Sequence, residues 1–563
     1  MNNEELKEKI YIFSLENASK HNGNANKGAI IGKVIAIDPS LKDTISTWQP
    51  LIDESISLIS SLTPEQIKEE LKAKDKQRFE NLSVKHKKDF NELPNAVMGK
   101  VVTRIPPEPS KYSHIGHALS FLINYIYAKK YQGRSILRFE DTNPGKSNWD
   151  YVNDCLASLE YIGITPDKTV YVSDDMEIFY DYAKKAIDTD KAYVCFCQKE
   201  TISDLRAKGI SCECSKASKE KNLSDWGKMK SGEYEEGKCT LRLRIDMKSN
   251  NFVMRDPSIF RIIKTPHYKQ GTKYFAWPMY DFENSIEEHL CGITHVLRSN
   301  EFGSMRIELQ DYIKDLFGLN KQTIIQYGRF NVEGATTQGR EIREMIESGK
   351  LLGWDDPRLV TVKALKRRGI IKETFLELAK QVGLSPTPTN LNWTLISSAN
   401  RKFLDASVPR FFLIKEPIKI KISNAPSEII KIKKHPAKDM GERTFETNED
   451  FIIEKSDFEK LEEGKIYRLI DCINFIKTKN GFEFHSKEYD KFPKDSIIIH
   501  WLPDNNSNID VAVMMPDANK IKCVAENSIK SLKTNDIIQF ARFGFCRLDN
   551  DDLDKMLFYY SHK

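Results

Sequence analysis

The 563-residue sequence contains no long hydrophobic run, since no apolar stretch approaches the roughly 20 residues of a membrane-spanning helix. Its start, MNNEELKEKIYIF, lacks the cationic residues and apolar core of a secretory signal. A strong charge of one sign is also missing, because 86 Lys and Arg oppose 81 Asp and Glu and leave a net charge of +5. We therefore expect a cytoplasmic chain without a membrane anchor, and net charge alone does not mark it as nucleic-acid binding.

Cysteine is scarce in the chain. Ten cysteines in a protein of this size, kept in a reducing compartment, favour free thiols over disulfides. The chain is 40% hydrophobic and 10% aromatic, which is enough for large cores. Because its length exceeds what one hydrophobic core usually supports, we expect several domains.

Local patterns divide the chain. Helix-period stretches and a Lys/Glu-rich run, QIKEELKAKDKQRFENL, predict a helical module without strands over residues 1–98. A short apolar strand, VVTRI from Val101, is followed by Pro106 and Pro107, a helix start, and a second strand, SILRFEDT from Ser135. Strands that alternate with helices in this way predict parallel βαβ units in a doubly wound sheet, whose ligands bind at the carboxyl ends of the strands.

The helix start carries two histidines and a glycine in the stretch SHIGHALSF. A helix N-terminus exposes free N–H groups and a partial positive charge, which suits a phosphate group. His114 and His117 add hydrogen-bond donors, and Gly116 leaves room for a nucleotide to approach. An arbitrary H-x-x-H is more often a pair of ordinary surface or core histidines. The surrounding sequence decides between these interpretations.

Several segments, in order, resemble class I aminoacyl-tRNA synthetases of the glutamyl and glutaminyl branch. TRIPPEPSKYSHIGHA is similar to the HIGH signature of that branch with its Pro-Pro-Glu-Pro lead-in, and LRFEDTNP follows as it does there. PMYDFENSIEEHLCGITHVLRSNEF resembles the second amino-acid-pocket segment, and GWDDPRLVTVKALKRRGI resembles the helical connector. NASKHNGNANKGAIIGKV, near the start, is similar to the appended domain of the archaeal type of glutamyl-tRNA synthetase.

The resemblance implies an architecture and a reaction. It implies an N-terminal helical domain at 1–98, a Rossmann-type α/β catalytic domain at 99–335 with an acceptor-binding insertion at about 180–275, a helical connector at 336–405 and β-barrel anticodon-binding domains at 406–563. The reaction implied is ATP-dependent ligation of glutamate to tRNA(Glu) through a glutamyl-adenylate (EC 6.1.1.17). Mg²⁺ accompanies ATP in the family, and a monomer is its usual form.

The pocket residues of the family carry over to positions in this sequence. Arg104 pairs with a carboxylate of the amino acid, and Glu140 binds its ammonium group. Tyr280 and Asn284 complete the pocket, although a tyrosine after Pro-Met could equally be ordinary core. Glu108 resembles the family residue that reaches the nucleotide or the tRNA end. Opposite charges at the two ends of the pocket suit a zwitterionic acidic substrate.

The choice between glutamate and glutamine depends on Arg298, which stands where glutamyl enzymes carry an arginine and glutaminyl enzymes a smaller uncharged residue. A guanidinium pairs bidentately with a carboxylate but only in part with an amide, so Arg298 favours glutamate. The alternatives are a surface ion pair at a strand end and, for the whole chain, a glutaminyl-tRNA synthetase. Charging of tRNA(Gln) with glutamate by a non-discriminating enzyme also stays open.

One loop departs from the family pattern. A KMSKS-like motif is expected between YGRFN and GWDDPRL, but the sequence there is GATTQGREIREMI, without the two lysines. Arg340 is then the cation placed to contact phosphates, and Gln338 or Thr337 could donate hydrogen bonds. Because arginine does not replace lysine in every geometry, this loop leaves open a catalytically inactive, synthetase-like tRNA-binding protein.

Four cysteines form two C-x-C pairs, at Cys195 and Cys197 and at Cys212 and Cys214. Four thiolates from two close pairs suit tetrahedral Zn²⁺, and other glutamyl enzymes carry a cysteine-rich zinc site in this insertion. The alternative is a group of unligated thiols in a loop. The zinc would be structural, because the chemistry calls for no open coordination position.

Beyond Leu404 the sequence alternates in the manner of strands, which predicts an all-β region. Lysines that alternate with isoleucines there mean a solvated face or an RNA contact: Lys415, Lys419, Lys421, Lys431, Lys433, Lys434 and Lys438. By resemblance, the connector offers a further set of tRNA contacts: Asp355, Asp356, Arg358, Lys363, Arg367 and Arg368.

Overall fold

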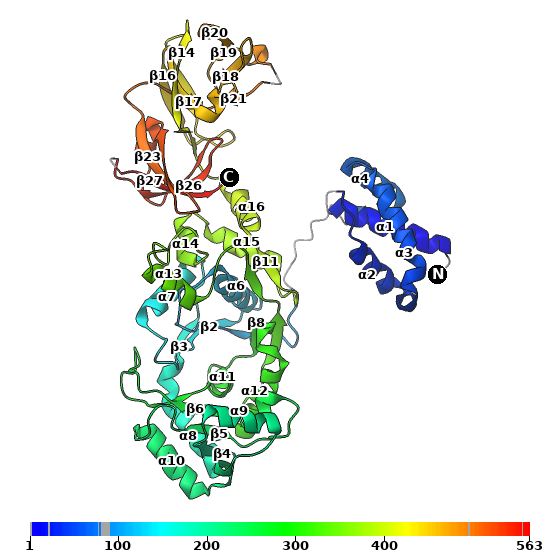
Figure 1. Ribbon diagram of the computed structural model, residues 1–563, viewed down its shortest axis with the longest axis vertical. Coiled ribbons are helices and arrows are strands. Elements are labelled where there is room, and N and C mark those ends of the chain that lie inside the picture. Colours follow the sequence, from blue (N-terminus) through cyan, green and yellow to red (C-terminus); the bar gives the residue numbers. More distant parts are fainter. Residues whose placement is uncertain (1–2, 21–22, 77, 80–90, 494–495, 554) are drawn as a thin grey trace. The chain divides into compact units, whose positions relative to one another are not determined.

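The structure, a computed structural model, describes residues 3–20, 23–76, 78–79, 91–493, 496–553 and 555–563. The chain divides into two compact units, residues 1–89 and 90–563 (Figure 1). We describe each unit by itself.

The first unit is helical, as the sequence predicts. Its helices are α1 (Asn3–Lys20), α2 (Lys27–Ile37), α3 (Ile45–Ser60) and α4 (Pro64–Lys74), with a 3₁₀ turn at Pro39–Thr44. The Thr63 side chain accepts from Gln66 N and the Gln66 side chain accepts from Thr63 N, a capping box that starts α4. The Lys/Glu-rich run continues to residue 82, of which residues 77 and 80–82 lie outside the described part of the chain.

The second unit begins with a parallel sheet of β1 (Val102–Ile105), β2 (Arg134–Phe139) and β3 (Lys168–Tyr171). Helices α6 (Ile115–Lys130) and α7 (Trp149–Tyr161) connect these strands, so the predicted βαβ order is confirmed. A second parallel pair, β8 (His295–Ser299) and β9 (Thr323–Tyr327), adjoins β1, because Thr294 N donates to Val102 O (3.0 Å).

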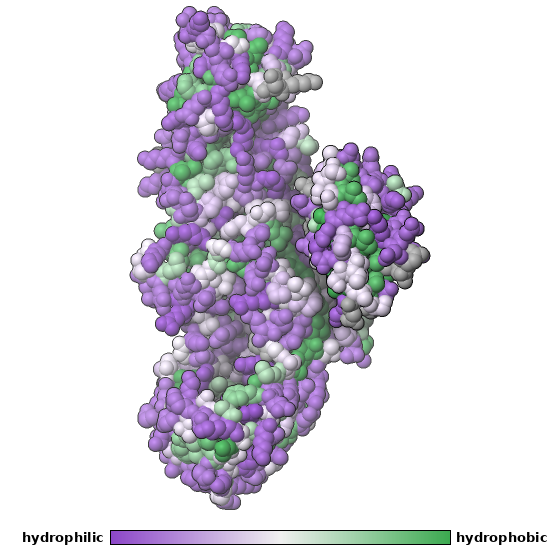
Figure 2. All heavy atoms as spheres, turned by 45° about the vertical axis from the view of Figure 1, so that its right-hand side comes forward, coloured by the Kyte–Doolittle hydropathy of each residue, from purple (hydrophilic) through white to green (hydrophobic). Residues whose placement is uncertain are grey.

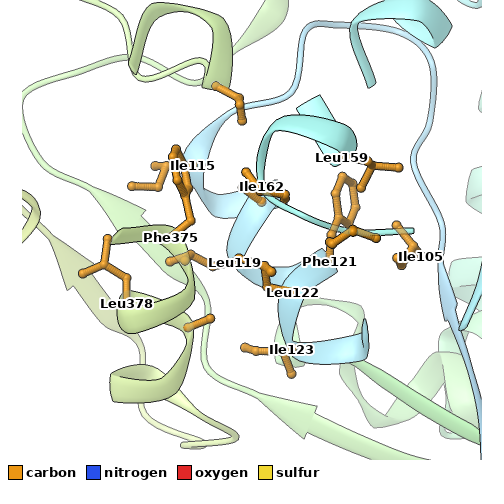
Figure 3. Close-up of a cluster of buried hydrophobic side chains, with 14 of the residues drawn as sticks. Ile105, Ile115, Leu119, Phe121, Leu122, Ile123, Leu159, Ile162, Phe375 and Leu378 are labelled. Carbon is orange, nitrogen blue, oxygen red and sulfur yellow. The ribbon is translucent and has the colours of Figure 1, made fainter. Parts of the chain in front are cut away.

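The core beside this sheet explains why the helices form where they do. Ile115, Leu119 and Leu122 recur on one face of α6 and are fully or almost fully buried. They pack with Phe375 and Leu378 of α15 (Lys372–Val382), as Figure 3 shows. Truncation of such a buried leucine costs about 2–5 kcal/mol of unfolding free energy. Helix α15 of the predicted connector therefore belongs to the same hydrophobic core as α6.

An insertion between β3 and β8 holds an antiparallel sheet in the order β4-β5-β6-β7. Its strands are β4 (Ala192–Cys195), β5 (Thr240–Leu243), β6 (Ser258–Ile262) and β7 (Ala276–Pro278), accompanied by α8 (Met176–Asp188), α9 (Lys199–Lys208) and α10 (Lys219–Ser231). The remaining elements before the β region are α11 (Tyr280–Leu290), α12 (Gly303–Phe317), β10 (Phe330–Val332), α13 (Gly339–Glu347), α14 (Val362–Arg367), β11 (Thr389–Leu391) and α16 (Trp393–Leu404).

The C-terminal region is built mainly of β-strands, as predicted. Two seven-stranded sheets and one hairpin are present among the described residues. The first sheet runs β12 (Arg410–Phe411), β25 (Ile537–Phe540), β26 (Gly544–Asn550), β27 (Leu557–His562), β23 (Ile509–Met514), β24 (Lys520–Ala525) and β13 (Leu413–Lys415). The second runs β21 (Ile498–Ile499), β18 (Ile466–Leu469), β19 (Asn474–Thr478), β20 (Gly481–Ser486), β14 (Pro417–Ser423), β17 (Asp450–Glu454) and β22 (Trp501–Pro503), and the hairpin is β15 (Glu428–Lys433) with β16 (Glu442–Thr447).

The predicted alternation of lysine and isoleucine follows the strand period. In β14, Ile420 and Ile422 are buried while Lys419 and Lys421 are exposed. Both lysines form ion pairs, Lys419 with Asp504 (2.9 Å) and Lys421 with Glu449 (3.2 Å). A face that is already partly paired has less charge available for RNA.

Hydrophilic side chains dominate the face of the molecule shown in Figure 2. Isolated large apolar side chains reach the surface, among them Ile429, Leu352 and Leu58. In the described part of the chain, no helix combines the length and the apolar character needed to cross a membrane.

Candidate active site

A cavity of about 650 Å³ lies at the carboxyl ends of β1, β2 and β8. Arg104 lines it from β1, Glu140 from the residues after β2, and Arg298 from β8. His114 and Thr337 line it from the helix start and from the loop before α13. Residues expected from the HIGH segment, the pocket segments and the altered loop thus meet at one cavity, although Asn284, Gln338 and Arg340 are not among those that line it.

The HIGH segment is held by backbone contacts to the connector. Ile115 N donates to Val360 O (2.9 Å), and Val362 N donates to Ser113 O (2.8 Å). His114 caps α6, with Nδ1 accepting from Gly116 N (3.1 Å), and its ring stacks on His117 at 3.8 Å between centroids. The connector therefore positions the helix start.

Both histidines are neutral. Burial lowers the pKa of His117 to about 3 and holds the pKa of His114 well below its usual value, and the nearby Lys111 charge adds to both shifts. Nδ1 of His114 accepts from Gly116 N, and Nδ1 of His117 accepts from His114 N (3.5 Å). A neutral imidazole that accepts at Nδ1 carries its proton at Nε2. The pair can therefore offer two N–H donors but no formal charge.

Gly116 makes room for an imidazole ring. A Cβ at this position would lie 2.9 Å from Cε1 and 3.1 Å from Nδ1 of His114. Any side chain at this residue would push the ring away from the helix start. The predicted contact of Gly116 with a nucleotide stays a prediction.

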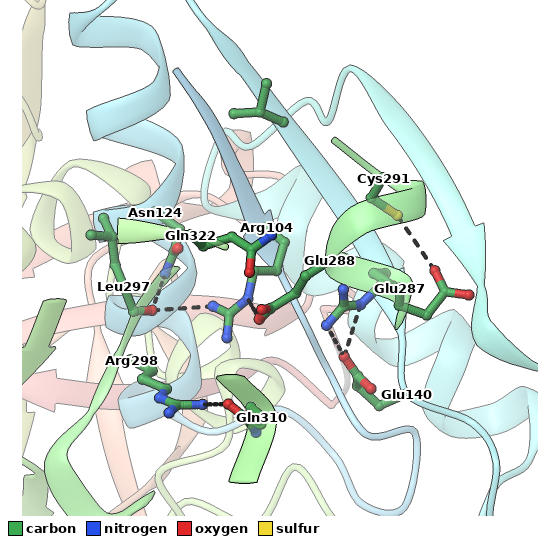
Figure 4. Close-up of polar contacts among 12 residues, drawn as sticks. Arg104, Asn124, Glu140, Glu287, Glu288, Cys291, Leu297, Arg298, Gln310 and Gln322 are labelled. Carbon is green, nitrogen blue, oxygen red and sulfur yellow. Dashed lines mark hydrogen bonds and ion pairs between the residues drawn. The ribbon is translucent and has the colours of Figure 1, made fainter. Parts of the chain in front are cut away.

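One end of the cavity holds buried, compensated charges (Figure 4). Arg104 Nη1 donates to Leu297 O (3.3 Å), and Arg104 Nε lies 3.6 Å from Glu288 Oε1. Lys314 Nζ donates to Glu288 Oε2 (2.9 Å). Burial opposes ionisation of Glu288, but Lys314, Arg104 and Arg138 outweigh it and lower its pKa. Glu288 is therefore an anion that holds Arg104 in place.

Glu140 lines the cavity, and one of its carboxylate oxygens is unpaired in the described part of the chain. Its Oε1 accepts from Arg138 Nε (2.9 Å) and Nη2 (2.7 Å). Its buried Oε2 has no hydrogen-bond partner among the described residues. With its amide oriented to suit its neighbours, Asn284 donates to Glu288 (2.9 Å) and accepts from Arg138 (2.7 Å). A buried, unsatisfied carboxylate oxygen is a site for a cationic ligand group.

Arg298 lies buried in the cavity wall and is oriented from α12. Its Nη1 donates to Gln310 Oε1 (3.1 Å) (Figure 4). Gln310 Nε2 in turn donates to Asp281 Oδ1 (3.0 Å). Tyr280 also lines the cavity, and burial raises the pKa of its hydroxyl, which stays protonated. Both residues thus lie at the same cavity as Arg104 and Glu140.

A second carboxyl group lies in the same wall. Glu283 lines the cavity and accepts a short hydrogen bond from Thr142. Burial, followed by the charge of Glu140, raises the pKa of Glu283 well above its usual value. Burial beside a second carboxyl group therefore favours the protonated form of Glu283.

The loop before α13 does not bring its arginine to the cavity. The Arg340 side chain is 88% exposed and pairs with Glu344 one turn along the helix (2.9 Å). Thr337 lines the cavity, whereas Gln338 is not among its lining residues and its backbone N donates to Thr336 Oγ1 (3.2 Å). The sequence expectation that Arg340 contacts phosphates therefore has no support from this arrangement.

Two other cations line the outer part of the cavity, where Glu108 is also found. Arg329 pairs with Glu301 (2.7 Å) and its side chain is 56% exposed. Lys111, three residues before His114, places its Nζ 3.5 Å from Thr337 O. Glu108 is exposed, so its carboxylate can meet a ligand from solvent.

The residues expected to contact tRNA in the connector mostly contact other parts of this chain. Asp356 is buried and accepts from Arg358 Nε (2.8 Å) and Nη2 (2.7 Å). Arg367 donates to Asp549 in β26 and to Asp355, and buried Arg368 donates to Ser561 O (2.7 Å). Of the six, Arg358 and Lys363 are exposed. Arg367 and Arg368 join the connector to the β region, and a tRNA contact stays a prediction for all six residues.

The four cysteines come together in the insertion. Their sulfur atoms all lie within 4.8 Å of one another, with Cys195 Sγ 3.7 Å from Cys212 Sγ and Cys197 Sγ 3.9 Å from Cys214 Sγ. A tetrahedron of thiolates at about 2.3 Å from zinc has S–S edges of about 3.8 Å. The hydrogen bond with Cys195 lowers the pKa of Cys212 to about 4. The arrangement therefore fits a metal of this kind and not a disulfide.

Sequence reasoning missed several of these residues. Arg138 lies two positions before Glu140, and the strand period places it on the same face. Glu288 lies four positions after Asn284 on α11, which is one helical turn. Those two spacings could have been found in the sequence. Lys314 comes from α12 and Lys111 from the lead-in, and no local period relates them to the pocket.

Comparisons with known proteins agree with this arrangement. A family model described as "tRNA synthetases class I (E and Q), catalytic domain" matches residues 100–406. Two models described as "tRNA synthetases class I (E and Q), anti-codon binding domain" match residues 408–488 and 472–549. The catalytic-domain match covers the cavity and all the residues around it.

Curated relatives match over nearly the whole chain. A glutamate–tRNA ligase of Pyrococcus abyssi is 36% identical over 98% of both chains. A glutamate–tRNA ligase of Nitrosopumilus maritimus is also 36% identical over 98% of both chains. One of Methanocaldococcus jannaschii is 35% identical over 99% of this chain and all of the relative. The similarity thus includes the helical unit as well as the cavity and the β region.

Proposed function

The chain belongs to the class I tRNA synthetases of glutamate and glutamine, and on that premise we propose that it joins glutamate to tRNA(Glu) at the expense of ATP. The observation that carries this proposal is the charge pattern of one cavity. Buried Arg104 and Arg298 and the open oxygen of Glu140 surround it. Two cations and one anion are complementary to an amino acid with two carboxylates and one ammonium group.

The amino-acid end selects glutamate by charge. Arg298, held by Gln310, pairs with the side-chain carboxylate, and Glu140 binds the ammonium group. Arg104, fixed by Glu288, pairs with a carboxylate. Glutamine would offer Arg298 an amide in place of a carboxylate, and an amide pairs with a guanidinium only in part. The arrangement therefore supports glutamate over glutamine as the substrate.

The reaction proceeds in two steps without a covalent enzyme intermediate. An α-carboxylate oxygen of glutamate attacks the α-phosphorus of ATP, and pyrophosphate leaves with the electron pair of the broken P–O bond. The terminal ribose 2′-hydroxyl of tRNA then attacks the mixed anhydride and releases AMP. His114 and His117 donate from Nε2 to the developing charge on phosphate oxygens. Exposed Glu108 would offer an oxygen ligand to the Mg²⁺ that accompanies ATP, and that ion would neutralise part of the phosphate charge.

The four cysteines hold structural zinc in the insertion that guides the tRNA acceptor end. The S–S distances of 3.7 and 3.9 Å support this proposal. Arg242 Nη1 lies 3.7 Å from Cys195 Sγ and 3.8 Å from Cys212 Sγ, so a cation partly offsets the charge of the thiolates.

The β region reads the anticodon, and the chain acts as a monomer. The two models for anticodon-binding domains support the first statement. The β region could accept tRNA(Glu) alone, which would make the enzyme discriminating, or also tRNA(Gln), which the enzyme would then charge with glutamate.

Aminoacylation assays with labelled glutamate and labelled glutamine, each offered tRNA(Glu) and tRNA(Gln) with ATP and Mg²⁺, test this function. We expect glutamate on tRNA(Glu) and no charging of glutamine. Glutamate on both tRNAs would mean a non-discriminating enzyme. Charging of glutamine would instead make it a glutaminyl-tRNA synthetase, and no charging at all would make it a synthetase-like tRNA-binding protein.

A further inference from the structure

The triphosphate of ATP needs positive charge that the loop before α13 does not supply. Arg340, the cation of that loop, is 88% exposed and paired with Glu344. Among the described residues, the cations that line the cavity are Arg104, Lys111, Arg261, Arg298 and Arg329. Arg104 and Arg298 belong to the amino-acid end, so the phosphates must meet one of the other three.

Lys111 is the candidate with a side chain placed between the HIGH segment and the loop. Its Nζ lies 3.5 Å from Thr337 O, at the long limit of a hydrogen bond, so a phosphate oxygen can replace this weak acceptor. The charges of Lys111 and Arg329 both act on His114, but of these two cations Lys111 is the one that acts on His117. Burial lowers the pKa of Lys111, and an approaching anion reverses that shift.

Gly339 makes room for the stem of this lysine. A Cβ at Gly339 would lie 2.9 Å from Lys111 Cβ and 3.3 Å from Lys111 Cδ. The close atom is Cβ, which cannot move away without a shift of the backbone. A second contact joins the same segments, because Arg343 Nη1 of α13 donates to Ser110 O (3.2 Å). The loop is therefore shaped around a lysine that comes from another segment.

The other two cations fit the phosphates less well. Arg329 pairs with Glu301 (2.7 Å), and its side chain is 56% exposed, so it has an anion already and is screened by water. Arg261 belongs to β6 of the insertion, away from the HIGH segment in the chain. Among the hydrogen bonds and ion pairs found for the described residues, neither arginine contacts the loop before α13, whereas Lys111 does.

We propose that Lys111 contacts the phosphates of ATP and takes the place of the lysine that the loop before α13 lacks. This inference rests on the proposed function. The lysine stays protonated throughout: the carboxylate–phosphorus bond forms, the bond to the bridging oxygen breaks, and the ammonium stabilises the charge on the departing pyrophosphate.

Kinetics of ATP–pyrophosphate exchange, measured with glutamate and tRNA present, test the proposal. We expect Lys111→Met to lower kcat/KM for ATP about 10- to 100-fold, the range for loss of one hydrogen bond to a charged group. The KM for glutamate should stay unchanged, and Lys111→Arg should restore part of the activity because it keeps the charge. Lys350→Met, at an exposed position in the segment after α13, is the matched control and should behave as wild type.

Binding measurements separate a phosphate contact from a structural role. Titration calorimetry should show that Lys111→Met weakens the binding of ATP but leaves the binding of adenosine unchanged. Gly339→Ala, which displaces the aliphatic part of the Lys111 side chain, should weaken the binding of ATP in the same way. If Lys111→Met lost affinity for ATP and for adenosine equally, or kept the exchange rate and the ATP affinity of wild type, the proposal would be overturned. A large loss of exchange activity in Arg340→Met but not in Lys111→Met would also overturn it. If wild type makes no exchange, the proposed function fails, while the comparison of ATP with adenosine still decides the role of Lys111.

Discussion

At the scale of single residues, the amino-acid end depends on the balance of buried charge around Glu288. This carboxylate lies between Arg104 (3.6 Å) and Lys314 (2.9 Å), and all three side chains are almost fully buried. Loss of one partner would leave a charge buried without compensation, which typically costs about 3–5 kcal/mol. Arg104, which we propose to bind the substrate, is thus held in place by residues that need not contact the substrate.

The neutral state of His117 predicts a dependence of stability on pH. Its folded pKa of about 3 lies below that of an exposed histidine, so between pH 6.5 and 3 the unfolded chain binds more protons. The stability contributed by neutral His117 is complete above pH 6.5 and is lost as the pH falls, by about 2 kcal/mol at pH 5. Thermal melting between pH 7 and pH 5 should therefore show a smaller decrease for His117→Gln than for wild type.

The control for this measurement is His485→Gln, because His485 is exposed. It should follow wild type over the same pH range. An equal loss of stability in wild type and His117→Gln would show that His117 is protonated in the folded state near pH 6.

The positions of some site residues could be predicted from sequence motifs, and those of others could not. Arg104, Glu140 and Arg298 follow or end buried strands, and the carboxyl ends of parallel strands meet, so their meeting at one cavity could be predicted. Arg340 could not be placed, because its direction depends on where α13 begins and how the helix is rotated. Lys111 could not be assigned either, since the glycine that accommodates it lies more than two hundred residues away.

At the scale of elements, the four cysteines of the insertion lie where a strand of its small sheet meets a loop. Cys195 ends β4, and Cys212 precedes a short 3₁₀ turn, so a shared metal would tie a strand to a loop. We predict that purified protein contains about one zinc ion per chain. Cys212→Ser should lose that zinc and melt at a lower temperature, because three ligands hold the metal more weakly than four.

Elemental analysis and thermal melting test this prediction, with Cys291→Ser as the matched control. Cys291 is partly buried and lies outside the group of four. Full zinc content in Cys212→Ser, or none in wild type, would contradict the structural zinc site.

Helices and strands with a clear hydrophobic periodicity could be predicted from the sequence. Contacts between residues far apart in the sequence could not. The helices of the first unit and the alternating strand β14 follow from periodicity, because one face of each is apolar. The connector residues Arg367 and Arg368 appeared from the sequence to face tRNA. The structure shows that they contact Asp549 and Ser561, whose proximity depends on how the β region packs, and their contact with tRNA stays a prediction.

At the scale of the whole second unit, Arg367 links the connector to the β region. It donates to Asp549 through Nη2 (2.8 Å) and Nε (3.2 Å) and to Asp355 through Nη1 (3.0 Å). If the β region binds the anticodon, its orientation sets how tRNA reaches the cavity. We predict that Asp549→Ala and Arg367→Ala each raise the KM for tRNA several-fold and leave the KM for glutamate unchanged.

Steady-state aminoacylation with varied tRNA measures both constants. Asp549 is an anion and cannot pair with phosphate, so an equal effect of the two variants supports the orienting role. An effect of Arg367→Ala without one of Asp549→Ala would mean that Arg367 contacts the tRNA directly.

The central claim is that a buried arginine makes this cavity a glutamate site, and charging of tRNA by wild type and Arg298→Ala tests it most directly. We predict that wild type charges glutamate and not glutamine, and that Arg298→Ala loses about 100-fold or more in kcat/KM for glutamate. Arg134→Ala, at an exposed arginine that begins β2, should charge as wild type. Full glutamate activity in Arg298→Ala, or charging of glutamine by wild type, would contradict the account.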